Sequence, residues 1–499
     1  MNLEQMVGLD AKFLYSETPT AHMHTLKVAV FDGSRLPERL SYDEVVELFG
    51  SRLYRLPSFR RRAVPIPLGL GHPVWVEDPC FDLRRHVTLR QVAAPGGQRE
   101  LASVVADIAG RPLPRDRALW EIVVVDGLAG RRVAVVAKVH HALADGAATV
   151  ALLQNVLDSS ILATPPEDVW RPEALPTQRQ LLALAARGHV TRSRGLWELV
   201  TLSVQGLRQA EAWRRSSPVR PPLPFDGPKT TFNVSLSPDR TFAMTSLALD
   251  DLKAVRRALG ATLNDVFLSV CAGAVRAYLA DRGELPTRPL VASVPVSTDP
   301  SLTRLGGNRV DNLFVSIGTD IADPIARVRH IHTVSTAAKQ VRSAFGNDLL
   351  RKRAEVVPPQ LYAFAVRTWS RTRLANRLRP PVNLILSNVA GPPQQLHVGN
   401  ATLEAVYSVG PILEGVGLNV TAWSYNGSLC ISLLGCPPSV PDPWMIADRL
   451  SASLAELMEA VANSAEVLPA GDDRLGAGTT PAGIIGGTPS RPATIGAAE

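Results

Sequence analysis

Short apolar runs of strand length alternate along this chain with longer segments whose apolar residues recur at helical spacing. Residues 26–30 alternate as in a half-buried strand, and a second strand is predicted around residues 74–76. Residues 40–53 and 98–109 have the periodicity of helices. This order of elements predicts an α/β (α+β) fold in which a mixed sheet is flanked by helices.

Residues 131–150, RRVAVVAKVHHALADGAATV, contain the most informative pattern. Four valines between residues 133 and 139 form a short apolar block that suits a strand buried on both faces. His140 and His141 follow this block, and from Gly146 onward the apolar residues recur at helical spacing. The segment is therefore predicted to be a strand, a loop and a helix, with both histidines at the end of the strand.

Two histidines at a strand end have several interpretations. A neutral imidazole can take a proton from a substrate hydroxyl or thiol near neutral pH, but such residues can also simply end a strand. Adjacent histidines on an extended segment, here His140 and His141, point to opposite faces and rarely bind one ion together, so no metal site is expected. Asp145 can cap the following helix, and Gly146 can permit a tight turn.

The second half of the chain repeats the alternation of strands and helices. Residues 261–283 are mostly apolar around the whole circumference of a helix, which is typical of a buried helix. Asn426-Gly427 predicts a hairpin turn, and residues 444–462 predict a final helix. The other predicted strands of this half lie at residues 242–249, 289–299, 306–320, 383–393, 403–412 and 415–435.

Segments of different composition separate and follow these elements. Residues 163–178 are rich in proline, and residues 179–215 form a basic helical segment whose apolar stripe can lie on a lipid surface or face a core. The tail of Gly, Ala, Thr and Pro is predicted to be disordered. The predicted regions are an N-terminal domain (1–162), a connection (163–229), a C-terminal domain (230–469) and the tail (470–499).

Composition narrows the class of protein. The 499 residues carry a formal charge of +7, without the stripe of basic and aromatic residues that tracks a phosphate backbone, so no nucleic acid is expected as a partner. No signal peptide is recognised, and no apolar run reaches the roughly 18 residues of a spanning helix. We expect a cytoplasmic protein or one that lies on a membrane. The cysteines, which are expected to be buried free thiols, are Cys80, Cys271, Cys430 and Cys436.

Taken together, residues 140–146 match HHxxxDG, the signature shared by acyltransferases and condensation domains of the CoA-dependent acyltransferase superfamily. Over residues ~5–465 the chain resembles the bacterial wax ester synthase/acyl-CoA:diacylglycerol acyltransferase family. Condensation domains are not expected to carry the other similar blocks in this order. These blocks are Leu9-Asp10-Ala11 with Phe13-Leu14, PSFRRR (57–62), PVWVED (73–78), Asn264-Asp265, Gly307-Asn308, SNVAGP (387–392) and GPILEGVGLN (410–419).

The resemblance implies two chloramphenicol-acetyltransferase-like domains with an active-site channel between them. It implies that His141 is the general base on the hydroxyl of diacylglycerol or of a long-chain alcohol. Acyl-CoA would be the co-substrate, no cofactor would be bound permanently, and the alkoxide would attack the thioester without an acyl-enzyme. The enzyme would associate peripherally with the inner face of the membrane or with lipid inclusions.

The resemblance also implies supporting residues. Asn264 and Asp265 would lie near His141 and support it, although a cap or a buried hydrogen bond at a helix start explains the same pair. His140, Asp145 and Gly146 would hold the loop, with His140 pointing away from the base.

Four positions depart from the family pattern and bear on substrate choice and activity level. Ala118 and Ala390 replace frequent prolines, and Ile317-Gly318 replaces a frequent Leu-Pro pair. Two alternatives therefore stay open beside triacylglycerol or wax ester synthesis. One is an acyltransferase of the superfamily that acts on another hydroxyl acceptor, and the other is a catalytically weak protein that binds lipid or coats lipid droplets.

Overall fold

The computed structural model of the protein describes residues 3–34, 41–144, 156, 170–188, 201, 205, 208, 219–297, 308, 310–345, 358–398 and 401–467. Met1–Val461 forms one compact unit. The predictions for Asp145, Gly146 and the tail at 470–499 lie outside the described residues, as does most of the basic segment at 179–215.

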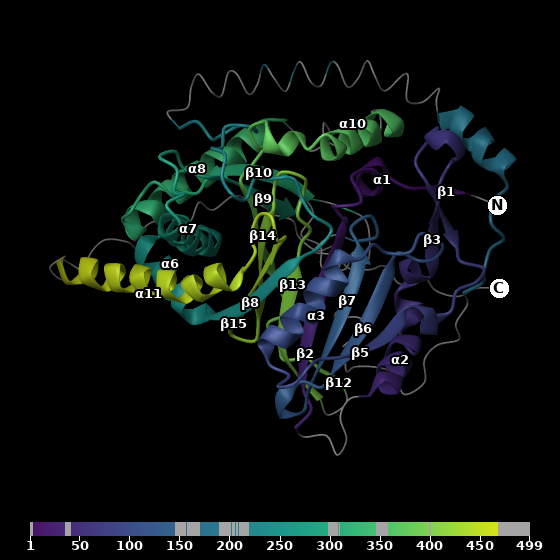
Figure 1. The fold of residues 1–499 in the computed structure, drawn as a ribbon, viewed down its shortest axis with the longest axis horizontal. Helices are drawn as coiled ribbons and strands as arrows, with labels where there is room; N and C mark the ends of the chain where they lie inside the picture. Colours follow the sequence, from purple (N-terminus) through teal and green to yellow (C-terminus); the bar gives the residue numbers. More distant parts are fainter. Residues whose placement is uncertain are drawn as a thin grey trace, which may run out of the picture. The chain divides into compact units, whose positions relative to one another are not determined.

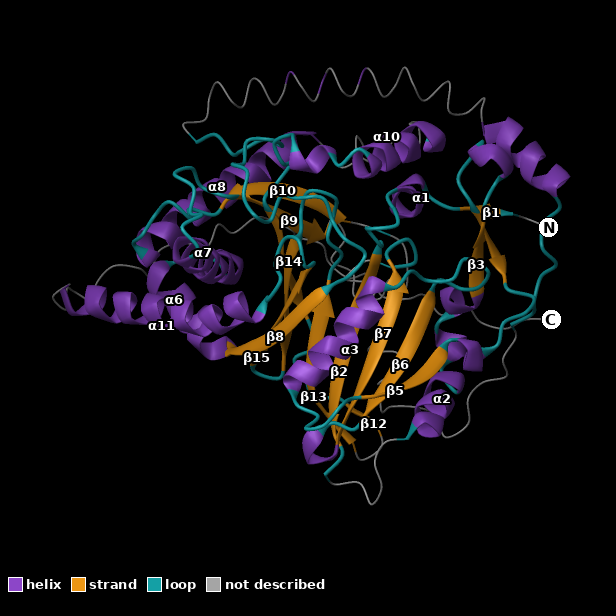
Figure 2. Ribbon diagram, viewed as in Figure 1, coloured by secondary structure: helices purple, strands orange, loops and turns teal. Residues whose placement is uncertain are grey.

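The described strands form two six-stranded sheets and one small sheet (Figures 1 and 2). The first sheet has the order β12 (His397–Val398), β13 (Ala401–Val409), β2 (His24–Asp32), β7 (Arg132–His140), β6 (Trp120–Asp126), β5 (Val87–Gln91). The second has the order β10 (Val310–Ser316), β9 (Val291–Ser297), β11 (Leu384–Ala390), β14 (Leu418–Tyr425), β15 (Ser428–Gly435), β8 (Thr241–Ala248). The small sheet consists of β1 (Glu4–Gln5), β4 (Val74–Glu77) and β3 (Arg61–Val64).

Helices cover these sheets. Parallel and antiparallel pairs occur in both large sheets, for example β5 with β6 and β6 with β7, so the predicted mixed α/β fold is confirmed. The labelled helices among the described residues are α1 (Gly8–Tyr15), α2 (Tyr42–Gly50), α3 (Gln98–Gly110), α6 (Leu249–Leu259), α7 (Leu263–Asp281), α8 (Pro324–Phe345), α10 (Pro359–Arg371) and α11 (Trp444–Val467).

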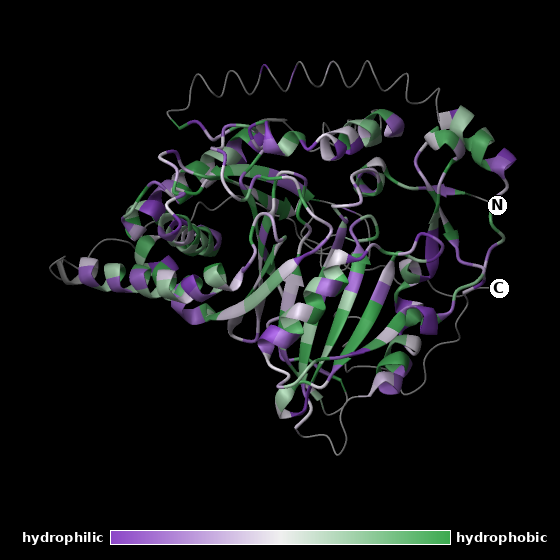
Figure 3. Ribbon diagram, viewed as in Figure 1, coloured by the Kyte–Doolittle hydropathy of each residue, from purple (hydrophilic) through white to green (hydrophobic). Residues whose placement is uncertain are grey.

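Both faces of the first sheet carry apolar side chains, and these side chains pack against a helix on each face. Val135 and Val139 of β7 belong to a core that includes Val45 of α2, whereas Val136 belongs to a core with Val105 of α3. Successive side chains of a strand point to opposite faces, so one strand contributes to both cores. Figure 3 shows the resulting hydrophobic colour along β6 and β7.

The core of the second sheet is built around α7. This helix begins at a capping box in which Thr262 and Asp265 bond each other's backbone N–H groups. Gly260, with φ of 62°, ends α6 directly before it. Nearly all residues from Asp265 to Leu279 are buried, which confirms the predicted buried helix. By length and composition α7 is a candidate membrane span, but most of it is buried inside the protein.

Strand β13 crosses between the predicted domains. It belongs to the second half of the chain, yet it pairs with β2, where Val406 lies opposite Ala29 and Ser408 opposite Lys27. The predicted strand at 403–412 therefore exists but extends the first sheet, because its apolar side chains join the core beside α2. The predicted hairpin is confirmed, since Asn426 and Gly427 have φ of 43° and 77° between β14 and β15.

Other sequence features have local explanations. Cys271, Cys430 and Cys436 are buried free thiols as predicted, but Cys80 is exposed because it lies in the turn after β4. Gly318, one of the departures from the family pattern, has φ of 60°, a conformation that proline cannot adopt. Ile317 and Ala118 are buried, and Ala390 ends β11.

Candidate active site

The two histidines of the motif lie where β7 ends and a turn begins. His140 is paired with His24 of β2, and the N–H of His141 donates to the carbonyl of Met23 at 2.7 Å. The N–H of Leu143 then donates to the carbonyl of His140 at 2.9 Å and closes the turn. The strand therefore directs the two imidazoles to opposite faces of the sheet.

His141 is half-buried and is held by groups from both halves of the chain. Phe13 of α1 stacks on its ring, with centroids 4.1 Å apart and planes 11° apart. Nδ1 of His141 lies 2.8 Å from Oδ1 of Asn308. Nδ2 of Asn308 donates to Oδ1 of Asp10, also on α1, at 2.8 Å and to the carbonyl of His141 at 2.7 Å.

These contacts determine which nitrogen of His141 carries the proton. Both neighbours of the Asn308 nitrogen, a carboxylate and a carbonyl oxygen, can only accept, so the amide nitrogen must face them. Oδ1 of Asn308 then faces Nδ1 of His141, and Nδ1 must be the protonated nitrogen. The lone pair of the neutral imidazole consequently lies on Nε2, as a general base requires.

His140 is fully buried on the opposite face. Its Nδ1 accepts a hydrogen bond from the N–H of Ala142 at 3.0 Å, so its proton lies on Nε2 and is donated to Oε1 of Glu17, also at 3.0 Å. His140 thus joins the turn to Glu17, two residues after the end of α1. His140 therefore lies on the face opposite His141, and its predicted role in holding the loop stays a prediction.

The ionisation states around His140 follow from burial and pairing. Burial lowers the pKa of His140, against the opposing effect of the Glu17 carboxylate, and favours the neutral ring. For Glu17, burial works against the charge, but the hydrogen bond with His140 and the nearby Arg115 outweigh it and lower the pKa to about 2. The carboxylate that holds His140 is therefore charged at neutral pH.

The same face of the sheet binds the last carbonyl groups of α3. Nζ of Lys138 donates to the carbonyls of Ile108 and Arg111 and to Oε1 of Glu121, at 2.6 to 2.9 Å. Nε2 of His24 lies 3.0 Å from the carbonyl of Ala109. Lys138 is completely buried, and burial lowers its pKa while Glu121 opposes that change. Polar groups on this face are used to fix the helix end beside the histidines.

The structure separates the supporting residues that the resemblance implied. Asp265 belongs to the capping box of α7 and lies 2.8 Å from Nδ1 of His332, and Asn264 lies in the first turn of the same helix. The amide on His141 is that of Asn308, whereas no hydrogen bond of Asn264 to His141 occurs among the described residues. For Asp265 the alternative interpretation, a helix cap, matches the observed contacts.

The sequence contained weak signals for the residues that surround His141. Asn308 occurs in the similar block Gly307-Asn308, and Asp10 and Phe13 occur in the block at residues 9–14. Those blocks indicated a family but assigned no role to these side chains. Glu17 stands outside the quoted blocks, and no pattern in the sequence links it to His140.

Comparisons with known proteins place this chain in a family. The profile of the wax ester synthase/diacylglycerol acyltransferase catalytic domain matches residues 6–267, and the C-terminal domain of the same family matches residues 306–458. A Mycobacterium tuberculosis protein named as a diacylglycerol O-acyltransferase is 39% identical over 93% of this chain and 98% of its own length. A second one from the same species is 36% identical over 92% of this chain and 90% of its own.

Solved structures share the fold. The wax ester synthase/diacylglycerol acyltransferase from Marinobacter aquaeolei VT8 has a TM-score of 0.66 and 25% identity, covering 92% of this chain and all of the other. The first condensation domain of the calcium-dependent antibiotic synthetase has a TM-score of 0.55 and 15% identity over 93% and 98% of the two chains, a likeness of fold alone. The chain thus belongs to the wax ester synthase/diacylglycerol acyltransferase family of enzymes.

Proposed function

We propose that this enzyme transfers a long-chain acyl group from acyl-CoA to the hydroxyl of diacylglycerol, with His141 as the general base. The observation that carries the proposal is the hydrogen bond between Nδ1 of His141 and Oδ1 of Asn308, because it favours the tautomer whose lone pair lies on Nε2. The relatives named as diacylglycerol O-acyltransferases support this acceptor. Long-chain alcohols are a second acceptor class, supported by the wax ester synthase of the same family.

In the proposed reaction, Nε2 of His141 takes the proton of the acceptor hydroxyl while the oxygen attacks the thioester carbonyl carbon. A C–O bond forms, and the carbonyl oxygen becomes an oxyanion. The oxyanion then re-forms the carbonyl, the C–S bond breaks, and the imidazolium returns the proton to the leaving thiolate, which yields the ester and free CoA. Such general-base help accelerates a reaction by about 10²–10⁴-fold.

A radiochemical assay tests the proposal. Purified protein is incubated with labelled palmitoyl-CoA and either diacylglycerol or hexadecanol, and the products are separated by thin-layer chromatography. We expect labelled triacylglycerol from the wild type and a loss of at least about 100-fold in His141→Ala. The matched control is His397→Ala, which removes an exposed histidine of β12 and should keep wild-type activity. Full activity of His141→Ala would contradict the assignment of the base.

We further propose that the enzyme binds lipid surfaces peripherally through α10. Leu361 and Phe364 are 61% and 69% exposed and lie three residues apart, on one side of the helix. Leu68, 84% exposed, belongs to the turn whose carbonyl accepts a hydrogen bond from Gln360 at the start of α10. The apolar patch formed by Leu68, Leu361 and Phe364 fits the acyl boundary of a lipid layer.

Exposed arginines follow this apolar patch along the chain and favour an anionic lipid surface. They are Arg367, Arg371, Arg373, Arg377 and Arg379. The patch also borders the site, because the hydroxyl of Tyr362 on α10 bonds Oγ of Ser16, directly after α1, at 3.0 Å. A lipid acceptor drawn from such a surface would enter close to the helix that carries Phe13.

Sedimentation with vesicles tests this contact. The double variant Leu361→Ser/Phe364→Ser should pellet less with phosphatidylglycerol vesicles than the wild type, because it loses the apolar anchor. Leu89→Ser, a change at a 55% exposed leucine on the edge strand β5, is the control and should sediment like the wild type. Equal sedimentation of the double variant and the control would reject α10 as the docking element.

A further inference from the structure

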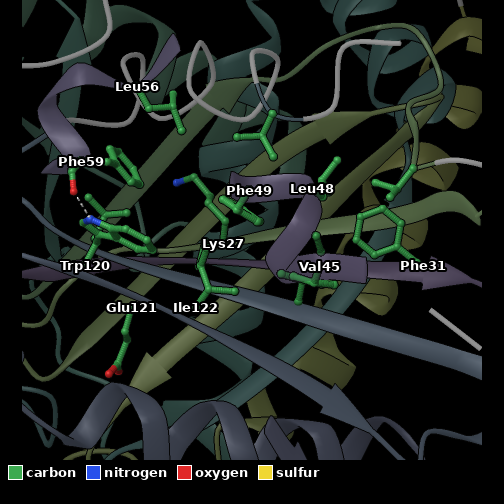
Figure 4. Close-up of a pocket in the computed structure, with 16 residues that line it drawn as sticks. Lys27, Phe31, Val45, Leu48, Phe49, Leu56, Phe59, Trp120, Glu121 and Ile122 are labelled. Atoms are coloured by element: carbon green, nitrogen blue, oxygen red, sulfur yellow. Dashed lines mark hydrogen bonds between the residues drawn. The ribbon is translucent and has the colours of Figure 1, made fainter. Parts of the chain in front are cut away.

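A cavity lies where the start of α3 meets both large sheets. Its volume is about 370 Å³, whereas the cavity between the first sheet and α2 (Figure 4) has a volume of about 60 Å³. Small-molecule sites typically measure about 300–1,000 Å³, so the larger cavity has the size of a ligand site. Its wall combines residues of β2, β7, β13, β8, β15 and α3, among them Val30, Arg132, Tyr407, Met244, Ser428 and Leu101.

The wall of this cavity is apolar at its floor and polar at its mouth. The floor consists of buried side chains that include Val30, Leu101 and Met244. The exposed residues at the mouth are Gln98, Ala129, Arg132, Ser246 and Glu404. Nε and Nη2 of Arg132 donate to the carboxylate of Glu404 at 2.7 and 3.1 Å, so these two charges pair with each other. A ligand with an apolar body and a polar end matches this wall.

Tyr407 adds one polar atom to the apolar floor. The residue is 5% exposed, and its hydroxyl makes no hydrogen bond with the residues that the structure describes. The hydroxyl oxygen is not fully enclosed, and because Tyr407 lines the cavity, its accessible surface faces the cavity. Burial, together with Cys430 and Glu404 of the same wall, raises the pKa of Tyr407, so the hydroxyl is a neutral donor near pH 7. Buried donors are normally bonded, so this hydroxyl calls for an acceptor on a ligand.

The start of α3 supplies further donors at the mouth. Gly97 stands at the N-cap and has no side chain to cap the helix, and its own N–H donates to Oε2 of Glu100 at 2.7 Å. Within the described part of the chain, the N–H groups of Gln98 and Arg99 have no hydrogen-bond partner. Such a helix end favours an anion. Because Glu100 and Glu404 already place two carboxylates here, a singly charged carboxylate is favoured over a doubly charged phosphate.

The cavity lies at the end of the first sheet that is remote from the histidine motif. Arg132, in the wall, begins β7, and His140 ends this strand. The usual rise of a strand places these two residues roughly 27 Å apart. α3 runs between the two places, since its start borders the cavity and its last carbonyls are bound by Lys138. A molecule in the cavity therefore does not touch the groups that react at His141.

We propose that this cavity is a second ligand site, which binds a small monocarboxylate that carries an uncharged oxygen at its other end. The carboxylate accepts hydrogen bonds from the N–H groups of Gln98 and Arg99 at the mouth. The uncharged oxygen accepts a hydrogen bond from the hydroxyl of Tyr407, and the apolar body between the two ends packs on Leu101 and Met244. This site does not depend on the proposed acyl transfer, because it shares no residue with the surroundings of His141.

Calorimetric titration with 4-acetylbenzoate tests the contact with Tyr407. This probe has a carboxylate and a keto oxygen at opposite ends of a ring, and 4-isopropylbenzoate replaces the keto oxygen by a methyl group. We expect the wild type to bind 4-acetylbenzoate at least tenfold more tightly than 4-isopropylbenzoate, and Tyr407→Phe to abolish this preference. The matched control is Tyr42→Phe, which removes a hydroxyl that donates to the carbonyl of Val87 outside the cavity, and it should keep the preference.

Three further measurements show whether the probe occupies this cavity. Ser246→Phe narrows the mouth and should weaken binding of 4-acetylbenzoate at least tenfold, whereas Ser451→Phe, at an exposed serine of α11, should leave it unchanged. His141→Ala should bind the probe like the wild type. Because the Tyr407 hydroxyl bonds none of the described residues, Tyr407→Phe should not lower the free energy of unfolding.

The proposal would be overturned by a folded wild type that does not bind 4-acetylbenzoate, or by a preference for the keto group that persists in Tyr407→Phe. Loss of binding in His141→Ala would place the probe in the acyl-transfer site and would also overturn it.

Discussion

The two faces of the first sheet are built by the same strands and both carry apolar cores, but they differ in the polar groups beside the two histidines. On the α3 face, Lys138, His140 and His24 are buried and bond to helix carbonyls or carboxylates. On the α2 face, Val135, Ala137 and Val139 line a cavity with an apolar wall, and the half-buried His141 is the next residue of the chain in the same phase. The comparison suggests a division of roles between the two faces. The buried polar groups of the α3 face hold the loop in place, and the α2 face, toward which His141 points, is left for substrate.

The physical reason lies in the free energy of buried polar groups. A buried donor or acceptor without a partner costs about 1–3 kcal/mol, so the hydrogen bonds of this cluster favour one arrangement of the backbone. Nδ1 of His24 is the exception in the cluster, because it has no partner among the described residues. His140 extends this cluster to the turn through the N–H of Ala142. His141 lies between His140 and Ala142 in the chain, so these contacts fix the position of its backbone while its ring remains half-buried.

The largest effect should come from breaking the α3 face at its buried cation. Lys138→Met leaves Glu121 and the carbonyls at the end of α3 without their donor, and we expect a loss of about 3 kcal/mol in the free energy of unfolding. Urea unfolding followed by circular dichroism measures this loss. Lys253→Met, at a lysine with 45% side-chain exposure, should change stability by less than about 0.5 kcal/mol. Equal stability of Lys138→Met and Lys253→Met would show that the buried polar contacts of the α3 face do not stabilise the fold.

A smaller effect is expected at the amide that orients the base. Asn308→Ala removes the acceptor for the Nδ1–H of His141. If the lost hydrogen bond raises the activation free energy by about 1.4 kcal/mol, kcat should fall about tenfold. Asn264→Ala is the comparison, because the family resemblance placed that amide near the base. Steady-state acyl transfer should be affected less by Asn264→Ala. The reverse order would show that the Asn308 contact does not position His141 during turnover.

A further difference between the two faces should appear in how the free energy of unfolding depends on pH. Burial lowers the pKa of His140 and His24 below the ordinary 6.5, so below about pH 6.5 the unfolded chain binds protons that the folded protein does not. The free energy of unfolding should fall as the pH falls from 7 to 5, by at most about 1.4 kcal/mol per pH unit for each group. Urea unfolding at several pH values measures it. Constant or rising stability over this range would contradict neutral histidines on the α3 face.

Glu17 extends the same trend to lower pH. Its pKa is lowered from 4.5 to about 2, so the stability that it contributes is present above pH 4.5 and disappears as the pH falls toward 2. Glu17→Gln should therefore flatten the acid limb of the stability curve. An unchanged acid limb in this variant would argue against a charged Glu17 that accepts a hydrogen bond from His140 and pairs with Arg115.

Local patterns predicted elements well where one period dominated. The strand that ends at His140, the buried helix α7 and the Asn426-Gly427 hairpin all follow from spacing and turn chemistry. The opposite orientation of His140 and His141 also followed from the two-residue repeat of a strand. These features depend on residues that are neighbours in sequence.

The features that could not be predicted from the sequence depend on contacts between segments that are far apart in the chain. The sequence of β13 predicts a strand but does not indicate which sheet the strand joins. Its pairing with β2 depends on packing between segments that are far apart in the chain. Asn308 bonds His141 across 167 positions of sequence, and His140 bonds Glu17 across 123. A single sequence shows each of these polar residues but not which of them are in contact, so the hydrogen bond of Asn308 to His141 could not be predicted. The supporting role of Asn264 stays a prediction.

The most direct test of the account is the pair His141→Ala and His140→Ala, each measured for acyl transfer per folded molecule and for free energy of unfolding. We expect the two variants to differ in opposite ways in activity and in stability. His141→Ala should lose at least about 100-fold in activity with nearly wild-type stability, whereas His140→Ala should lose about 1–3 kcal/mol of stability with activity within about tenfold of wild type. If His140→Ala abolished turnover in a stable protein while His141→Ala remained active, the assignment of the two faces would be wrong.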